Sequence, residues 1–313
     1  MVKTAFIISW FGDKPELREL RKEQHRKQLN SILNQTDWNI LIYAQMYDKE
    51  DFTNNPRIKY IENNERVLRP NLARNILKKE FYNSNEDYGL FIDDDVIIEK
   101  NFVDTLTNKK ELLEKAFTDY KIGFISTQFG FGSNSLRLNN AVNTIKLSKF
   151  AKEHEDNTIL YLADKACPEG LYIMRNFKKM NNIEFYYDNA MKFSMGKDLH
   201  CQLLEKGFSI YYFWNLNSDF GDNKSVDTST IAKYRKDTGK NSEFSSVRRY
   251  FFTKWINKWK VPRLKPNQVL YNVQQIRFLL MWGQEKFLNL NKLPYKIAIS
   301  NDDIVGTTLK NIK

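Results

Sequence analysis

The sequence has few of the residues that build disulfide frameworks or clustered metal sites. Only two cysteines, Cys167 and Cys201, and three histidines occur in 313 residues. The two cysteines lie in unrelated contexts and form neither a disulfide framework nor a thiolate cluster, so we expect a reducing compartment. No stretch approaches the roughly 20 apolar residues that a membrane helix needs. We therefore expect a cytoplasmic protein, in the host cytoplasm if a phage encodes it.

Acidic residues are in deficit, with 38 Asp and Glu against 49 Lys and Arg, for a net charge of +11. Such an excess favours a polyanionic partner, for example nucleic acid or an anionic membrane face. A soluble surface rich in lysine would give the same excess. With 42% hydrophobic residues the chain can build a full core, which fits one large domain or one domain with an appendage.

Short apolar runs alternate with helical stretches, which is the pattern of βα units in a mostly parallel sheet. The expected fold class is therefore α/β. We expect strands at 3–10, 39–45, 57–61, 89–92, 121–128, 170–174 and 208–213, and helices at 15–33, 71–82, 101–120 and 196–206.

The C-terminal part has a different character. From Phe244 to Arg277 there are eight basic residues and no acidic one, interleaved with aromatic residues. We expect residues 226–313 to form a basic, aromatic and mainly helical appendage to a domain at 1–225.

Three consecutive carboxylates, Asp93, Asp94 and Asp95, follow the apolar run of residues 90–92 and precede another at 96–98. Like charges between two buried segments require a positive partner. Ligands of open α/β sheets bind at the carboxyl ends of strands, and alternation places Asp93 and Asp95 on one face and Asp94 on the other. Two convergent carboxylates suit Mg²⁺ or Mn²⁺ carrying a nucleoside diphosphate. The alternative is a solvated acidic turn.

The stretch "LFIDDDV" resembles the strand of GT-A glycosyltransferases, especially the family-2-like group, that ends in Asp-x-Asp or Asp-Asp-Asp. Upstream, "RIKYIENNERVLRPNLARNIL" is similar to the family segment that ends in Ala-Arg-Asn before a helix. Downstream, "EGLYIMR" resembles the strand on the acceptor side, and "FSMGKDLHCQLLEKGFSIYYF" resembles the Glu-Asp helix and the strand after it. The resemblance covers residues 3–225. It implies a Rossmann-like GT-A domain, a UDP-sugar donor, and Mn²⁺ or Mg²⁺.

The resemblance also implies donor-binding residues. Asp93 would contact the ribose or the metal, Asp95 would coordinate the metal, and Asp94 belongs to the same set. Arg74 would face the diphosphate or position the aspartates. The residues expected near the nucleotide base end the first strand: Ser9, Trp10 and Phe11.

Asp198 matches the family's catalytic base, which would remove the proton of the acceptor hydroxyl. The chain departs from the family pattern at two places. Lys197 stands where a Glu usually precedes that Asp, and the family's later metal-binding His is absent. Asp219, or failing that Asp222, would take the place of that His as a metal ligand.

Three acceptor hypotheses remain open. The first is duplex DNA, with glucose or arabinose added to hydroxymethylated cytosine as in large phages, because basic residues can bind phosphates. The second is a capsule, lipopolysaccharide or glycoprotein acceptor at the cytoplasmic membrane face, with peripheral membrane contact. The third is a nucleotide- or DNA-binding module without catalysis. The residues expected to contact nucleic acid are Arg248, Arg249, Lys254, Lys258 and Arg263.

Overall fold

The computed structural model describes residues 2–10, 15–45, 54–63, 70–94, 96–119, 122–129, 159–162, 170–191, 195–220, 242–259 and 298–300. The other residues include four of the predicted site residues: Phe11, Asp95, Asp222 and Arg263.

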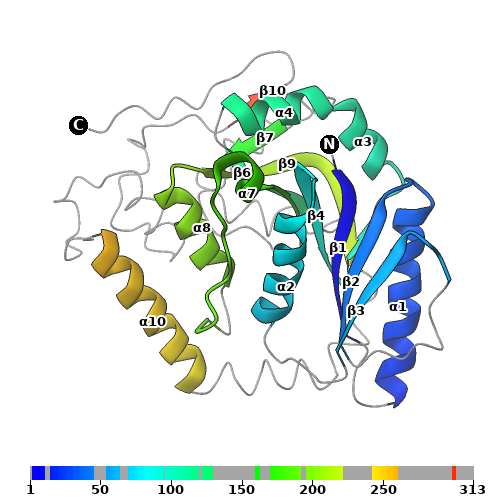
Figure 1. Cartoon of the computed structure of the whole chain (residues 1–313), viewed down its shortest axis with the longest axis horizontal. Coiled ribbons are helices and arrows are strands. Elements are labelled where there is room, and N and C mark those ends of the chain that lie inside the picture. The colour runs from blue at the N-terminus through cyan, green and yellow to red at the C-terminus, as the bar shows by residue number, and fades with distance from the viewer. Residues whose placement is uncertain are drawn as a thin grey trace.

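A ten-stranded mixed sheet forms the centre of the described structure (Figure 1). The strand order is β10-β7-β9-β6-β8-β4-β1-β2-β3, and β5 pairs with β9 outside this path. The strands β1, β2, β3 and β4 run parallel to one another, whereas β8 is antiparallel to both β4 and β6. The strands are β1 (Val2–Trp10), β2 (Asn39–Gln45), β3 (Ile58–Asn63), β4 (Tyr88–Asp93), β5 (Val96–Ile98), β6 (Ile122–Phe129), β7 (Ile159–Leu162), β8 (Leu171–Arg175), β9 (Ser209–Phe220) and β10 (Ala298–Ser300).

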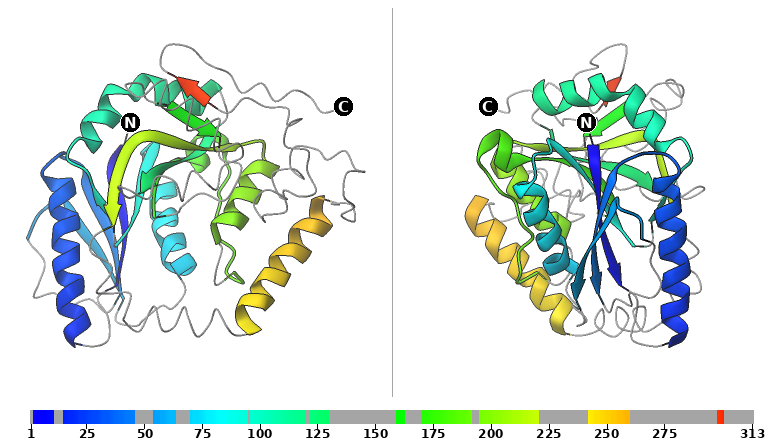
Figure 2. Two further views of the ribbon diagram at one scale, coloured as in Figure 1. Left: turned by 180° about the vertical axis from the view of Figure 1, so that it is seen from behind. Right: turned by 45° about the vertical axis from the view of Figure 1, so that its right-hand side comes forward.

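Helices cover both faces of the sheet (Figures 1 and 2). On one face, α1, α3 and α4 contribute to a single hydrophobic cluster. On the opposite face, α2, α7, α8 and α10 contribute to a second, more aromatic cluster. The helices are α1 (Pro15–Leu33), α2 (Pro70–Asn83), α3 (Phe102–Asn108), α4 (Lys110–Asp119), α7 (Phe177–Asn181), α8 (Met195–Glu205) and α10 (Ser242–Trp259).

The side-chain alternation of β4 explains why the sheet has two buried faces. Leu90 and Ile92 point into the cluster under α1, whereas Phe91 points into the cluster under α2. Gly89 permits close packing on the α2 side, because a Cβ atom there would lie 2.9 Å from the ring of Phe81. Alternation continues past the strand end, so Asp93 and Asp94 face opposite helices.

The predicted α/β class is confirmed, and several elements differ in detail. The helix expected at 101–120 is divided at Lys109 into α3 and α4, and the last predicted strand continues to Phe220 as β9. Of the region expected at 226–313, the structure describes α10 and β10, and both contact the domain expected at 1–225. Residues of α10 belong to the second hydrophobic cluster, and β10 pairs with β7 in the main sheet.

Candidate active site

We call residues 93–95, at the end of β4, the acidic turn. Two arginines pair with the carboxylates of Asp93 and Asp94. Nη2 of Arg74, on α2, donates to Oδ1 and Oδ2 of Asp93 at 2.8 and 2.7 Å. Nη1 of Arg21, on α1, donates to Oδ2 of Asp94 at 3.2 Å. Because α1 and α2 lie on opposite faces, Asp93 and Asp94 point to opposite sides, as alternation predicts.

A polar face of α1 holds this turn in place. Nε2 of Gln28 donates to the carbonyl oxygens of Asp93 at 2.6 Å and Val96 at 2.8 Å, so one side chain joins both ends of the turn. One turn earlier in α1, Nδ1 of His25 lies 3.1 Å from Oγ of Ser9. Burial lowers the pKa of His25 to about 3, against a hydrogen bond with Gln28 that raises it. His25 is therefore neutral near neutral pH.

Two of the three residues predicted to lie near the nucleotide base, Ser9 and Trp10, are at the end of β1. Ser9 is buried and faces α1, so its hydroxyl holds His25 in this structure. Trp10 is the last residue of β1 and pairs with Gln45 of β2. Because Ile8 pairs with Asp93, the end of β1 and the acidic turn lie side by side.

The backbone also brings Asp219 to the acidic turn. Asp219, in β9, is the register partner of Ile97 in β5, and β5 begins one residue after Asp95. Within the described residues no group of three or more potential metal-binding side chains occurs. The backbone register nevertheless places Asp219 near the end of β4, where Asp93 lies. Carboxylates are the ligand type that Mg²⁺ and Mn²⁺ prefer, so a metal site here stays a prediction.

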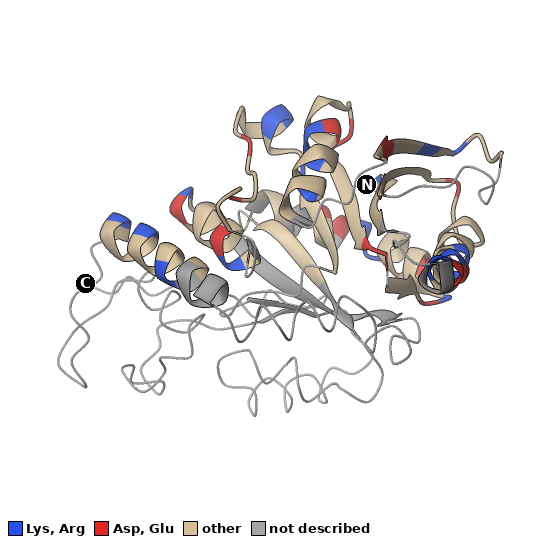
Figure 3. Cartoon of the chain, turned by 90° about the horizontal axis from the view of Figure 1, so that it is seen from below, with Lys and Arg blue, Asp and Glu red and all other residues tan. Residues whose placement is uncertain are grey.

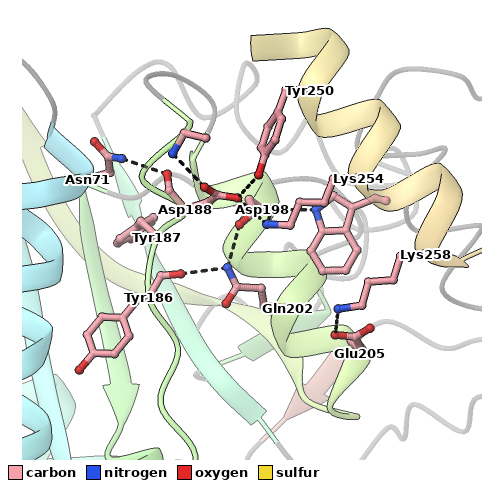
Figure 4. Close-up of polar contacts among 12 residues, drawn as sticks. Asn71, Tyr186, Tyr187, Asp188, Asp198, Gln202, Glu205, Tyr250, Lys254 and Lys258 are labelled. Atoms are coloured by element: carbon pink, nitrogen blue, oxygen red, sulfur yellow. Dashed lines mark hydrogen bonds and ion pairs between the residues drawn. The ribbon is translucent and has the colours of Figure 1, made fainter.

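Asp198, in the first turn of α8, is completely buried. Its Oδ2 accepts a hydrogen bond from Nε2 of Gln202 at 2.7 Å. Its Oδ1 accepts one from Nε1 of Trp255 at 2.7 Å and lies 2.8 Å from Nζ of Lys254 (Figure 4). Both of the latter residues belong to α10, so the C-terminal helix covers the predicted catalytic base.

Lys254 joins Asp198 to a second carboxylate, Asp188, that the sequence analysis did not select. Nζ of Lys254 and the hydroxyl of Tyr250 donate to Oδ2 of Asp188 at 2.7 and 2.8 Å (Figure 4). Burial acts to raise the pKa of Asp188, but the hydrogen bonds from Lys254, the Ala190 N–H and Tyr250 outweigh it, so the pKa lies below its usual value. No sequence motif marks Asp188. The segment from Phe244 to Arg277, which is basic and has no acidic residue, indicated only that its lysines need acidic partners elsewhere.

Helix α2 contacts both the acidic turn and the segment that carries Asp188. The guanidinium of Arg74, which holds Asp93, lies 5.7 Å from the centroid of the Tyr187 ring. Asn71, one turn earlier on α2, donates to the carbonyl oxygen of Asp188 at 3.0 Å. Asp188 is thus placed by the same helix that supplies the cation for the acidic turn.

Two of the lysines predicted to contact nucleic acid, Lys254 and Lys258, are paired with carboxylates of the chain, and their role in nucleic-acid binding stays a prediction. Lys254 bridges the two carboxylates described above, and Nζ of Lys258 lies 2.7 Å from Glu205 of α8. Figure 3 shows basic segments of α10 beside acidic segments of α8. Arg249 is exposed, and Arg248 lies in α10.

No family model matches the sequence, and no curated protein matches it. Solved structures of S. aureus TarS do resemble the fold. TarS 1–349 aligns with 93% of this chain and 74% of its own, at 12% identity and a TM-score of 0.53. A longer TarS structure aligns at 11% identity and the same TM-score over 95% of this chain, which spans 46% of the TarS chain. A complex of TarS 1–349 with UDP-GlcNAc aligns over 68% of this chain with a TM-score of 0.41. The chain therefore shares the GT-A fold with TarS 1–349.

Proposed function

We propose that this protein is a metal-dependent glycosyltransferase that moves a sugar from a UDP-sugar to an acceptor hydroxyl. The observation that supports this most strongly is the pair Asp93 and Asp94 at the carboxyl end of β4. In an open α/β sheet this is where ligands bind, and the sheet has the topology of a GT-A enzyme.

The donor would lie over the acidic turn. Asp93, Asp95 and Asp219 would hold a divalent cation, which offsets the charge that develops on the leaving diphosphate. Arg74 is already held against Asp93 and would face the same diphosphate. Gln28 holds the carbonyl groups of Asp93 and Val96, so the backbone on both sides of the turn is fixed before any ligand arrives.

The acceptor would approach from the side of α8 and α10. The resemblance assigns the general base to Asp198, and this assignment stays a prediction. In the ligand-free arrangement Gln202, Lys254 and Trp255 donate to Asp198 and leave it with no exposed surface.

Hydroxymethylated cytosine in duplex DNA is our first candidate acceptor. Its support is the net charge of +11 and the eight basic residues between Phe244 and Arg277, including the exposed Arg249. A saccharide or lipid-linked acceptor at the membrane face is the second candidate. A third hypothesis has no acceptor, because the chain would be a binding module without catalysis. Among the described helices, none has both the length and the apolar character needed to cross a bilayer.

A matrix of donors and acceptors tests this proposal. UDP-glucose, UDP-arabinose and UDP-GlcNAc would each be incubated with Mn²⁺ and with hydroxymethylated DNA, free saccharides or lipid-linked saccharides. We expect UDP release, and a nucleoside heavier by one sugar in the mass spectrum of the digested DNA. Transfer to a saccharide alone would contradict the DNA acceptor, and the absence of UDP release from every combination would contradict the enzyme assignment.

A further inference from the structure

Two carboxylates share one lysine at the predicted acceptor side, and they differ in access. Nζ of Lys254 lies 2.7 Å from Asp188 and 2.8 Å from Asp198. The side chain of Asp188 is 18% exposed, whereas that of Asp198 is 0% exposed. Only one of the pair can therefore meet a substrate without a rearrangement of α10.

The surroundings of Asp198 suit a structural anion better than a base. Three donors, from Gln202, Lys254 and Trp255, occupy the two oxygens of Asp198 and leave its side chain 0% exposed, whereas the side chain of Asp188, which also accepts from three donors, stays 18% exposed. A proton acceptor must come within hydrogen-bond reach of the group that it deprotonates. The indole of Trp255, which donates to Asp198, is itself completely buried, so the contact with α10 must open before a substrate can reach that carboxylate.

A chain of contacts links Asp188 to the predicted donor site. Asn71 of α2 holds its carbonyl oxygen, and its neighbour Tyr187 packs against Arg74, the residue that holds Asp93. Its Oδ2 accepts from Lys254 and Tyr250, and its Oδ1 accepts from the N–H of Ala190 at 2.9 Å. Asp188 is thus both accessible and fixed in orientation.

We propose that Asp188 takes the proton of the acceptor hydroxyl, and that Lys254 and Asp198 are positioning residues that hold Asp188 for this role. The assignment rests on the proposed glycosyltransferase function. As the acceptor oxygen bonds to the anomeric carbon of the sugar, its proton passes to a carboxylate oxygen of Asp188. The bond from that carbon to the diphosphate oxygen breaks, and its electron pair leaves with UDP.

The charged groups around Asp188 predict how the pH dependence of the rate changes if Asp188 is the base. Lys254 and Tyr250 contact Asp188 directly, Asp198 shares Lys254 with it, and Arg74 lies behind Tyr187. Removing the ammonium group in Lys254→Met takes away an interaction that favours the ionised carboxylate. The acid limb of the rate profile should then move to higher pH, whereas a purely structural Lys254 would lower activity at every pH alike.

The experiment compares Asp188→Asn and Asp198→Asn in the full chain. Glu205→Gln is the matched control, because Glu205 is also paired with a lysine of α10 at 2.7 Å but lies two turns further along α8. Each variant is checked for folding by circular dichroism, for UDP binding by calorimetry, and for UDP release with the donor and acceptor that the wild-type protein turns over.

We expect Asp188→Asn to bind UDP as the wild type does and to lose about 10²–10⁴-fold in turnover. Asp198→Asn should lose much less, and Glu205→Gln should retain the wild-type rate. Wild-type turnover by Asp188→Asn, or a larger loss in Asp198→Asn, overturns the assignment. If Asp188→Asn does not fold, the Lys254→Met profile decides, and an unmoved acid limb overturns it. Failure of the wild type to release UDP contradicts the proposed function itself, and the assignment fails with it.

Discussion

The indole Nε1 of Trp255 donates to Oδ1 of Asp198 at 2.7 Å, across 57 positions of sequence. This bond joins a helix near the C-terminus to the first turn of α8, within the second hydrophobic cluster. The basic, aromatic segment that the sequence presents as an appendage is therefore part of the predicted active site.

Trp255→Phe should lower the free energy of unfolding by about 1–3 kcal/mol, because it leaves a buried carboxylate without one of its donors. Denaturant titration measures this loss. Thr253→Ala, on the exposed side of the same helix, should leave the midpoint nearly unchanged. A Trp255→Phe protein as stable as the wild type would mean that the indole hydrogen bond adds nothing.

Gln28→Leu should destabilise the fold by about 1–3 kcal/mol, since the carbonyl groups of Asp93 and Val96 lose their shared donor. It should also weaken UDP binding although Gln28 is not expected to touch the ligand, because the acidic turn is no longer fixed. Calorimetry with UDP and Mn²⁺ measures the second effect. Lys27→Met, which breaks only an exposed ion pair with Glu23, is the control, and equal binding by the two variants would contradict the role of Gln28.

His25 should make the protein less stable in mild acid. Its pKa is about 3 in the folded protein and 6.5 when exposed, so the unfolded chain binds the proton first. The contribution of His25 to the free energy of unfolding is therefore complete above pH 6.5. It falls by about 1.4 kcal/mol per pH unit as the pH drops towards 3. Denaturant midpoints at about pH 7 and about pH 5 should differ more in the wild type than in His25→Gln. Identical pH slopes in the two proteins would refute this.

DNA binding, if DNA is the acceptor, should depend on Arg249 more than on Lys258. Arg249→Glu should weaken binding and reduce the salt slope by about 0.9 for one lost phosphate contact. Lys258→Glu should have the smaller effect, because Lys258 is paired with Glu205. Binding isotherms over a series of salt concentrations measure both slopes. A larger effect of Lys258→Glu would show that its ion pair opens on DNA.

Local patterns allowed much of the fold to be predicted. The helix at 15–33 and the strand at 39–45 have the predicted bounds, because alternation, a Pro in the first helical turn and apolar spacing are local signals. The position of the acidic turn at the end of β4 followed from the same alternation. The short strands β7 and β10 were missed because their pairing partners lie far away in the chain.

The partners of the site residues could not be predicted in the same way. Arg21 and Gln28 reach the acidic turn from 65 to 73 positions away, and they lie on a helix whose inward face is polar rather than apolar at this point. The sequence suggested a phosphate-binding role for Lys254 because its carboxylate partners, Asp188 and Asp198, are 66 and 56 positions earlier. Charge pairing over such distances becomes visible only once the sheet and its helices are in place.

Calorimetric titration with UDP tests the central claim, a nucleotide-sugar site at the acidic turn, most directly. Wild type and Asp93→Asn would be compared in Mn²⁺ and in EDTA, with Asp87→Asn as a control that removes an exposed carboxylate paired with Lys179. The account predicts that wild type and Asp87→Asn bind UDP in Mn²⁺, and that binding is lost in EDTA and weakened in Asp93→Asn. The account would be contradicted if the wild type did not bind UDP in Mn²⁺. It would also be contradicted if the wild type bound UDP equally well in EDTA, or if Asp93→Asn bound UDP as tightly as the wild type.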